Sequence, residues 1–535
     1  MRVGLSAAAA LLLAAPPFVP SAKAQLLPDT GTTVQVGALR QQLEGLMGTS
    51  TPATPGWTFV PSLGIQESWT NQLLETNGTG KSSFITALLP SVLINGQTGR
   101  TTTTVSYAPA LEYYSNAKQT QINQNLNAAS TITLVPERLF LDLHGFAAVQ
   151  PTYGGYGPAG TTAVSAHDQT QTLGFSAHPY LRQSFNDLGS AELGATVSHA
   201  SQNGVASTMA SGQPAPLGTV GAQNLTSEQE YFSLTSGPAF GRTSAGLMLS
   251  ASQDTGSGVM SNASQDEAVV NLGYAVTRSV TALVSFGYDD VHYAGTPPYT
   301  YTGPQWSVGA HWIPNPDSSV TVSHGRQQGV QSAQLDADYA VTARMRVFAR
   351  YSDGLSTGLQ QLLNAMNGST LDAQGNPIAL NGTPVQLNNS FYGVQNNLAQ
   401  VTDASVTVTT LFDRDAISVT FSRQQSHQIA AASAAAAAAS AGNPNSTGWY
   451  GTLSWQRSLW PDLNASAFVQ WGTNQGLQTG TSQNSDTLVF SLNLSYAVSR
   501  TVNAYAQYSW TRQSNPGAAP TLPTNLIVIG ANKTF

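Results

Sequence analysis

Runs of alternating apolar and polar residues constrain this chain most. From Trp57 onward, runs of about ten residues follow one another, separated by turns and polar loops. In the run 486–496, Leu488 and Leu492 fall on one face, and Ser491 falls on the other. Because successive side chains of a strand point to opposite faces, each run predicts a strand with one apolar and one polar face.

The composition decides what kind of sheet these strands build. Only 9% of the residues are charged, against roughly 25% in soluble domains. The mean hydropathy is nevertheless −0.11, and beyond the N-terminus no apolar run approaches the roughly 18 residues of a membrane-spanning helix. Strands that alternate lipid-facing and lumen-facing residues account for both observations. A net charge of −7 gives no basic surface for nucleic acid, and no cysteine is available for a disulfide or a metal.

The connections between the runs alternate in length. Short turns of related sequence occur at 274–280, 339–345 and 496–502, and long polar loops lie between such turns. Counting hairpins gives about 22 strands, whose even number suits antiparallel closure. The sequence therefore predicts an all-β fold: a single closed antiparallel transmembrane β-barrel over 57–535, with long loops on one rim and short turns on the other. The nine tryptophans lie near predicted strand ends, where aromatic girdles meet lipid headgroups. The expected long loops are 70–82, 151–169, 202–227, 254–266, 290–303, 353–399, 428–446, 472–485 and 511–523.

The N-terminus predicts export. Arg2 supplies a positive charge, 7–15 is an apolar core, and 22–24 is a small-x-small cleavage site. We expect a signal peptide over 1–24, a periplasmic leader over 25–56, and a mature protein in the outer membrane of a Gram-negative bacterium.

The last strand carries a further signal. Ile527, Ile529 and Phe535 fall on one face of the segment 525–535. A chain that ends on an aromatic residue in this way resembles a bacterial outer-membrane β-barrel, whose terminal strand is read by the barrel-insertion machinery. Lys533 departs from this resemblance, because a second aromatic residue is usual there.

Three segments resemble one family. The segments 56–65, 83–86 and 134–142 are similar to an outer-membrane β-barrel porin family that is associated with exopolysaccharide export and PEP-CTERM sorting systems. The resemblance covers 57–535, and its motifs are structural turns and strands. It implies a barrel for passage, with periplasmic export components as partners, and it supplies no catalytic residues.

A wide barrel has an open lumen or a plug. The leader 25–56 is too short for the globular plug that ~22-stranded transporters carry. The candidate gate is the loop 353–399, which contains a predicted helix over 357–366. Its leucines either dock inside the barrel or belong to a loop that caps the outside. The candidate gating residues are Leu359, Leu362 and Leu363.

Most residues expected to face the lumen are Ser, Thr, Asn, Gln and Gly. The hairpin 335–351 is an exception, because it places two acidic and two basic residues on the face opposite its apolar ones. They form either a transverse charge field that screens solutes or a ladder of ion pairs in the wall. The four residues of this charge ladder are Asp336, Asp338, Arg346 and Arg350. Further lumen candidates are Glu112, Asp142 and His144.

An enzyme is the second class considered. His199 and Ser201 would lie on the lipid-side face of one strand, which resembles the His-x-Ser pair of outer-membrane lipid A deacylases. Those enzymes are small barrels, and no acidic orienting residue follows from the sequence near this pair. No metal-binding or phosphate-binding motif occurs. We therefore expect no enzyme, no metal and no cofactor, with a lipid esterase as a remote alternative.

The function predicted from the sequence is porin-like passage of hydrophilic molecules, as an isolated pore or as the outer-membrane part of exopolysaccharide export. The alternative is a structural or surface-interaction barrel with a closed lumen. A wide lumen with few charges favours transport, and a lumen packed shut favours the structural role.

Overall fold

The structure is a computed structural model that describes residues 56–72, 81–116, 118–151, 169–203, 222–371, 377–379, 397–433, 445–475, 484–514 and 523–535. The expected signal peptide 1–24 lies outside the described residues, as does the expected leader 25–56 apart from its last residue.

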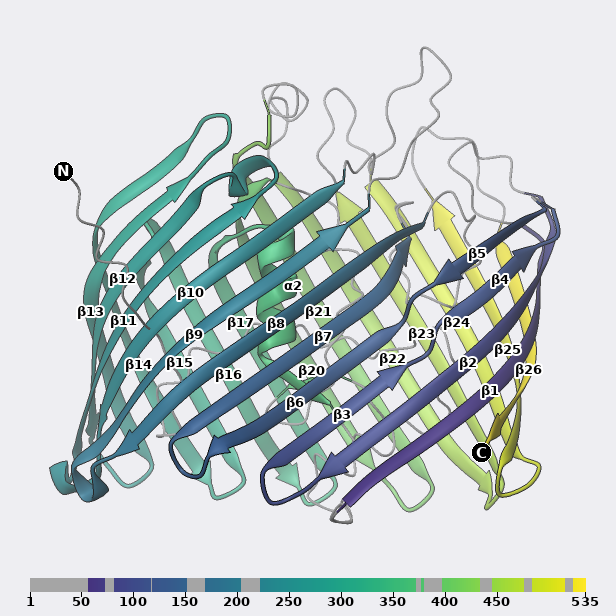
Figure 1. The fold of residues 1–535 in the computed structure, drawn as a ribbon, viewed down its shortest axis with the longest axis horizontal. Coiled ribbons are helices and arrows are strands. Elements are labelled where there is room, and N and C mark those ends of the chain that lie inside the picture. The colour runs from purple at the N-terminus through teal and green to yellow at the C-terminus, as the bar shows by residue number, and fades with distance from the viewer. Residues whose placement is uncertain are drawn as a thin grey trace.

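Strands make up nearly all of the described chain (Figure 1). The strands of the main sheet are β1 (Gly56–Thr70), β2 (Ser83–Gln97), β3 (Thr101–Tyr107), β4 (Ala110–Tyr114), β5 (Gln119–Asn123), β6 (Leu126–Val135), β7 (Leu139–Pro151), β8 (Gln169–Ser184), β9 (Gly189–Gln202), β10 (Gln223–Ser236), β11 (Thr243–Gly256), β12 (Ala263–Ala275), β13 (Val280–Tyr293), β14 (Tyr299–Asn315), β15 (Ser318–Gln327), β16 (Val330–Thr342), β17 (Met345–Ser356), β20 (Leu398–Leu411), β21 (Asp415–Ala430), β22 (Asn445–Trp460), β23 (Leu463–Gln475), β24 (Asn484–Ala497), β25 (Val502–Ser514) and β26 (Thr524–Thr534).

The other elements are small. They are the helix α2 (Gly358–Asn367), the hairpin of β18 (Ser369–Leu371) and β19 (Pro377–Ala379), and the 3-10 turns η2 (Asn186–Leu188), η3 (Pro238–Phe240) and η4 (Gly258–Met260). Among the described residues, no helix is long and apolar enough to cross a membrane.

The main sheet closes on itself. β1 pairs with β2 on one side and with β26 on the other, so the first and last strands complete a ring. The sheet has 24 segments, but β3 with β4, and β5 with β6, are each one wall strand with an interruption, which leaves 24 − 2 = 22 strands. Pro109 lies at the first interruption, where it has no N–H to donate to the ladder. The predicted closed antiparallel barrel of 22 strands is confirmed.

The two faces of the wall follow the alternation in the sequence. In β24, Leu494 and Tyr496 are 40% and 49% exposed on the outer face, while Ser491 on the lumen face is fully buried. In β26, Ile527 and Ile529 are also exposed on the outside, and so is Phe535, the residue after this strand. Apolar side chains therefore cover the outside of the ring, and small polar ones line its inside.

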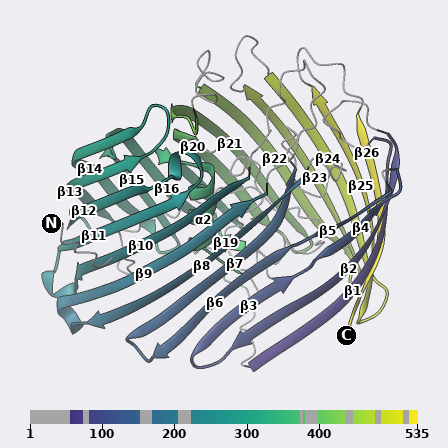
Figure 2. The ribbon, with the colours of Figure 1, turned by 45° about the horizontal axis from the view of Figure 1, so that its top comes forward.

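Several strands extend further than the sequence predicted. The expected loops 254–266 and 290–303 are wrong at their ends, because β11 to β14 continue into both. The outer face of this extension is polar, and Thr302 Oγ1 donates to Asp290 Oδ1 over 2.9 Å. Trp306 consequently lies well inside β14 and not at a strand end. The tilted strands form a tall wall, and two views show how it extends upward at β11 to β14 (Figures 1 and 2).

Candidate site in the barrel lumen

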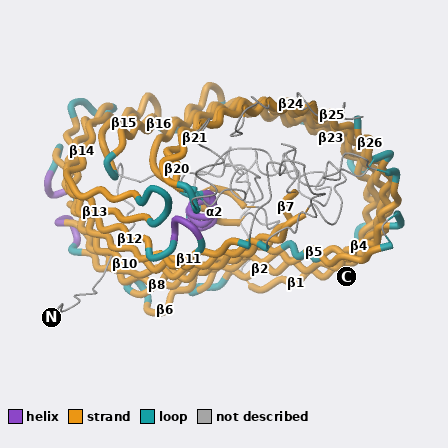
Figure 3. The backbone as a smooth tube through the Cα atoms, turned by 90° about the horizontal axis from the view of Figure 1, so that it is seen from above, coloured by secondary structure: helices purple, strands orange, loops and turns teal. Residues whose placement is uncertain are grey.

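The helix α2 lies inside the ring of strands when the barrel is seen from above (Figure 3). It begins with a capping box. The Thr357 hydroxyl accepts from the Gln360 backbone N–H over 3.3 Å, and the Gln360 side-chain oxygen accepts from the Thr357 N–H over 3.1 Å. Two N–H groups that a helix start leaves unpaired are thereby satisfied. The sequence placed this helix at 357–366, within one residue of its bounds.

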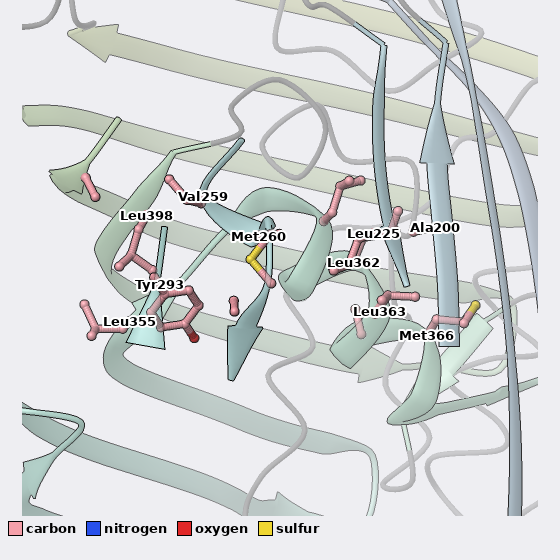
Figure 4. Packing of buried hydrophobic residues seen from close by; sticks show 14 of the residues in the cluster. Ala200, Leu225, Val259, Met260, Tyr293, Leu355, Leu362, Leu363, Met366 and Leu398 are labelled. Carbon is pink, nitrogen blue, oxygen red and sulfur yellow. The ribbon is translucent and has the colours of Figure 1, made fainter. Parts of the chain in front are cut away.

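One face of α2 is apolar and buried. Leu359, Leu362 and Leu363 are 3%, 1% and 4% exposed, and Met366 packs beside them (Figure 4). Of the two alternatives drawn from the sequence, the structure has the leucines inside the barrel. Burial of each such side chain stabilises docking by about 1.5 to 3 kcal/mol.

The wall is shaped to receive the helix. A Cβ on Gly174 of β8 would lie 3.4 Å from Met366 Sδ, so the glycine allows the helix to approach the strand closely. Asn367 Nδ2 donates to Ser198 Oγ on β9 over 3.3 Å. At the other end, Gln360 Nε2 donates to Asp254 Oδ2 on β11 over 3.3 Å. The helix is thus held against β8, β9 and β11 at both of its ends.

An apolar cluster extends from α2 to the opposite wall. Besides the helix it includes residues of β7, β9, β10 and β13 on one side and of β17, β20 and β21 on the other. Six wall residues of the cluster are Phe146, Ala200, Leu225, Tyr293, Leu355 and Leu398. Figure 4 shows Tyr293, Leu355 and Leu398 at one end of this packing and Ala200, Leu225 and Met366 at the other.

Backbone hydrogen bonds reinforce the connection. The N–H of Thr296 donates to the carbonyl oxygen of Ala431 over 2.9 Å, and that of Ala431 donates back over 3.1 Å. The N–H of Ala294 donates to the carbonyl oxygen of Val259 over 3.1 Å. The β13–β14 turn therefore meets both the end of β21 and the η4 turn. We call α2 with this cluster and these turns the lumen bridge.

The predicted charge ladder lies on β16 and β17. Arg346 Nε and Nη2 reach the two oxygens of Asp338, each over 3.1 Å, and Arg350 Nε lies 3.2 Å from Asp336 Oδ2. Phe348 is 1% exposed and lies between the two arginines on the lumen face. The structure brings together all four residues that the hairpin pattern singled out.

A second polar network lies on β7 to β10, on the short-turn side of α2. Glu192 accepts from Arg182 Nε over 2.8 Å and from the Tyr231 hydroxyl over 3.1 Å. The same hydroxyl is 2.6 Å from His178 Nε2, and His178 Nδ1 is 3.9 Å from Asp142. The sequence had singled out only Asp142 of this network. The repeated polar positions 178–182 on a lumen face were the signal that could have found the rest.

The remaining lumen candidates are separate from this network or at its edge. Glu112 on β4 accepts from the Tyr114 hydroxyl over 2.8 Å and from Asn123 Nδ2 over 3.0 Å. His144 lies on the lumen face of β7, opposite Ser176 of β8. Within the described ranges, no group of three or more histidine or acidic residues is arranged to hold a metal ion.

A carboxylate pair at the long-loop side was missed. Glu267 of β12 accepts from Gln305 Nε2 over 2.8 Å, and Asp289 of β13 accepts from the N–H of Gln328 over 2.6 Å. Gln328 belongs to the β15–β16 turn, and its carbonyl accepts from the Tyr299 hydroxyl over 2.6 Å. The turn therefore folds over β14 to reach β13. The residues singled out from the sequence did not include this pair, although Glu267 and Asp289 directly adjoin the expected loops 254–266 and 290–303.

His199 and Ser201 face outward on β9, as the sequence predicted. His199 Nδ1 is 2.9 Å from the Thr226 hydroxyl of β10, and its ring packs against Phe175. No hydrogen bond joins His199 to Ser201 in the described part of the chain. The arrangement needed for a serine activated by histidine is therefore not formed.

No family model matches the sequence, and no curated protein is significantly similar to it. The resemblance to the porin family remains an expectation from the motifs alone.

Solved structures resemble this chain over most of its length. One is the FrpB iron transporter from Neisseria meningitidis, F5-1 variant, at 11% identity and a TM-score of 0.49, covering 94% of this chain and 87% of that chain. Another is the ferric-catecholate import receptor Fiu from E. coli K12 in its open form, at 10% identity and a TM-score of 0.47, covering 90% and 82%. The siderophore receptor PirA from Pseudomonas aeruginosa is similar at 10% identity and a TM-score of 0.40, covering 91% and 81%. At these identities and scores, the similarity says nothing of what this chain binds.

Proposed function

We propose that this chain is an outer-membrane barrel that lets hydrophilic molecules pass, and that α2 narrows the passage. The observation that carries the proposal is the closed ring of 22 strands with an apolar outer face and a polar lumen face. Lipid would surround the ring, because its outer face is apolar and charged residues on a lipid-facing strand surface are costly. A ring of this size is wide enough to hold a water-filled channel unless something fills it.

Exopolysaccharide export is the narrower form of this proposal. It rests on the sequence resemblance, which also implies periplasmic export components as partners. The barrel-insertion machinery would be a further partner, through Ile527, Ile529 and Phe535. The two isoleucines lie on the outer face of β26 and Phe535 directly follows that strand, where Lys533 Nζ lies 5.0 Å from the Phe535 ring centroid.

A structural barrel with a closed lumen is the second candidate. The lumen bridge favours it, because the bridge connects opposite walls by buried side chains and backbone hydrogen bonds. A lipid esterase is not proposed, because His199 is engaged by Thr226.

Single-channel conductance of the purified protein in a planar bilayer tests the proposal. Steady openings whose conductance rises with salt concentration support passage. A folded barrel without openings overturns it and supports the structural role. Folding is checked beforehand in detergent, where a folded barrel should stay folded until the sample is heated.

A further inference from the structure

The lumen bridge divides the long-loop mouth of the barrel into two unequal parts. It joins β7–β13 to β17–β21, so β14–β16 lie on one side of it. The other side is lined by β22–β26 and, beyond the closure, by β1–β6. We call these the narrow side and the wide side. Figure 3 shows α2 between a small ring segment with β14–β16 and a longer segment with β23–β26.

The mouth of the narrow side is packed with protein groups. The β15–β16 turn bends inward, and its Gln328 N–H reaches the fully buried Asp289 across β14. Glu267 is engaged by Gln305, and Tyr299 bonds the same turn. A solute on this side would have to displace charged and hydrogen-bonded side chains, and leaving a buried carboxylate without its partner costs more than breaking a neutral contact.

The charge ladder presents little net charge to a solute. Each carboxylate of the ladder is paired with one guanidinium, and one of the two pairs is bidentate. Two opposite charges in contact produce a field that falls off faster with distance than that of either charge, and salt screens it further. The ladder is therefore suited to holding β16 to β17.

The wide side has a different chemistry. The lumen faces of the described strands β22–β26 and β1–β3 carry no charged side chain, only hydroxyl, amide, glycine and apolar groups. On the described strands β4–β6 the lumen-facing charge is Glu112, whose carboxylate accepts two hydrogen bonds. Hydroxyl and amide groups can both donate and accept hydrogen bonds, as the hydroxyl groups of an uncharged solute do.

The helix is also neutral where it is exposed. Asn364 and Asn367 are exposed, and Gln361 is half-buried one turn before Asn364. These three amides lie on one face because residues three or four apart are neighbours on a helix. The polar face of α2 therefore matches the uncharged wall of the wide side.

We propose that solutes cross the barrel on the wide side, and that this path takes uncharged, hydroxyl-bearing solutes and selects weakly by charge. The narrow side does not conduct, and its ion pairs hold neighbouring strands of the wall together. This inference rests on the proposed passage function and names its route and its solute class.

The chain has no cysteine, so single cysteines can test the route in the full-length protein. Ser466 of β23 and Ser323 of β15 are both half-buried and lumen-facing, one on each side of the bridge. The variants Ser466→Cys and Ser323→Cys are treated in open bilayers with a methanethiosulfonate reagent that carries a sulfonate. Asn493→Cys, opposite Ser466 on β24, is the second wide-side variant in case Ser466→Cys folds poorly.

Modification of the Ser466→Cys or Asn493→Cys variant should reduce the single-channel current and shift the reversal potential toward cations, because it places a fixed negative charge on the path. In the Ser323→Cys variant the current should not change, whether or not mass spectrometry finds the reagent attached. A block in the Ser323→Cys variant, or unchanged current in both wide-side variants, overturns the inference. A wild-type barrel that never conducts overturns the proposed function itself, which is a different result.

The solute class has its own test with the wild-type protein. Proteoliposomes should admit a neutral sugar faster than a carboxylated sugar and an amino sugar of similar size, and the cation and anion permeabilities should be nearly equal. Strong preference for either ion, or exclusion of the neutral sugar while charged sugars enter, would contradict an uncharged path.

Discussion

Thr296 and Ala431 exchange two backbone hydrogen bonds across the lumen, although β14 to β17, β20 and β21 separate them along the wall. This contact, with the buried face of α2, ties together two walls that the strand order keeps apart. Removal of either part of the lumen bridge should therefore change what the lumen admits.

Deletion of 357–366 should raise the single-channel conductance, because it removes α2 from the lumen. The measurement is conductance in a planar bilayer at fixed salt. The control is Thr357→Ser, which keeps the capping hydroxyl and so leaves the helix in place. Unchanged conductance in the deletion variant would remove α2 from the mechanism.

Leu362→Ala should weaken docking without removing the helix. Leu362 is 1% exposed, and leucine-to-alanine changes at such sites cost about 2 to 5 kcal/mol. The expected result is frequent switching between the wild-type conductance and a higher one. A single conductance level equal to that of wild type would show that the packing does not limit the current.

Thr357→Ala should destabilise the start of α2 by about 1 kcal/mol, because the capping hydroxyl is lost. This corresponds to an increase of about fivefold in the ratio of undocked to docked helix. Thr357→Ser keeps the hydroxyl and should restore the wild-type ratio. The open-state dwell times of the three proteins give the comparison.

Replacing Arg346 and Arg350 together by Ala should leave the ion selectivity unchanged, because the ladder lies off the path inferred above. It should lower barrel stability, since two carboxylates lose their partners. Reversal potentials in a salt gradient and the unfolding temperature in detergent measure the two effects. A shift toward cations would restore the interpretation of the ladder as a transverse field that screens solutes.

Deletion of Phe535 should reduce the amount of barrel that reaches the outer membrane in cells, while the refolded protein in detergent keeps its stability. The residue is 67% exposed at the end of β26, where it contributes little to packing. Thr534→Ala is the matched control, since it changes the neighbouring residue on the other face. Equal amounts of both variants in the membrane would rule out a role in insertion.

The sequence was sufficient to predict the strands of the wall, but not the lumen bridge that connects opposite parts of it. The number of strands and the direction of each side chain follow from the alternation of apolar and polar residues, because lipid on one side and a polar lumen on the other impose a period of two. The ion pairs of the ladder follow from the tight turn between Thr342 and Met345, which fixes the register of the hairpin. The residue range of α2 follows from the Thr357 capping signal and the leucines after it.

Other features left no local signal. The strand extensions beyond the apolar band carry polar side chains on their outer face, as at Asp266 and Asp290, so they lack the lipid-facing apolar residues of the other strands and look like loops. The lumen bridge depends on contacts between segments far apart in the chain, such as Asn367 with Ser198. Periodicity and turn chemistry describe neighbours in sequence and therefore do not report such contacts.

The bridge joins residues far apart in the chain, and this determines when it can form during folding. The N–H and carbonyl groups of Thr296 and Ala431 can meet only after the strands between them have formed. Contacts with large sequence separation form late because the intervening chain must first be ordered, and small units with few contacts open first when a protein is stressed. We therefore expect the wall to close first, and the bridge to narrow the interior only in a last step. Mild destabilisation should reverse that step while the wall stays intact.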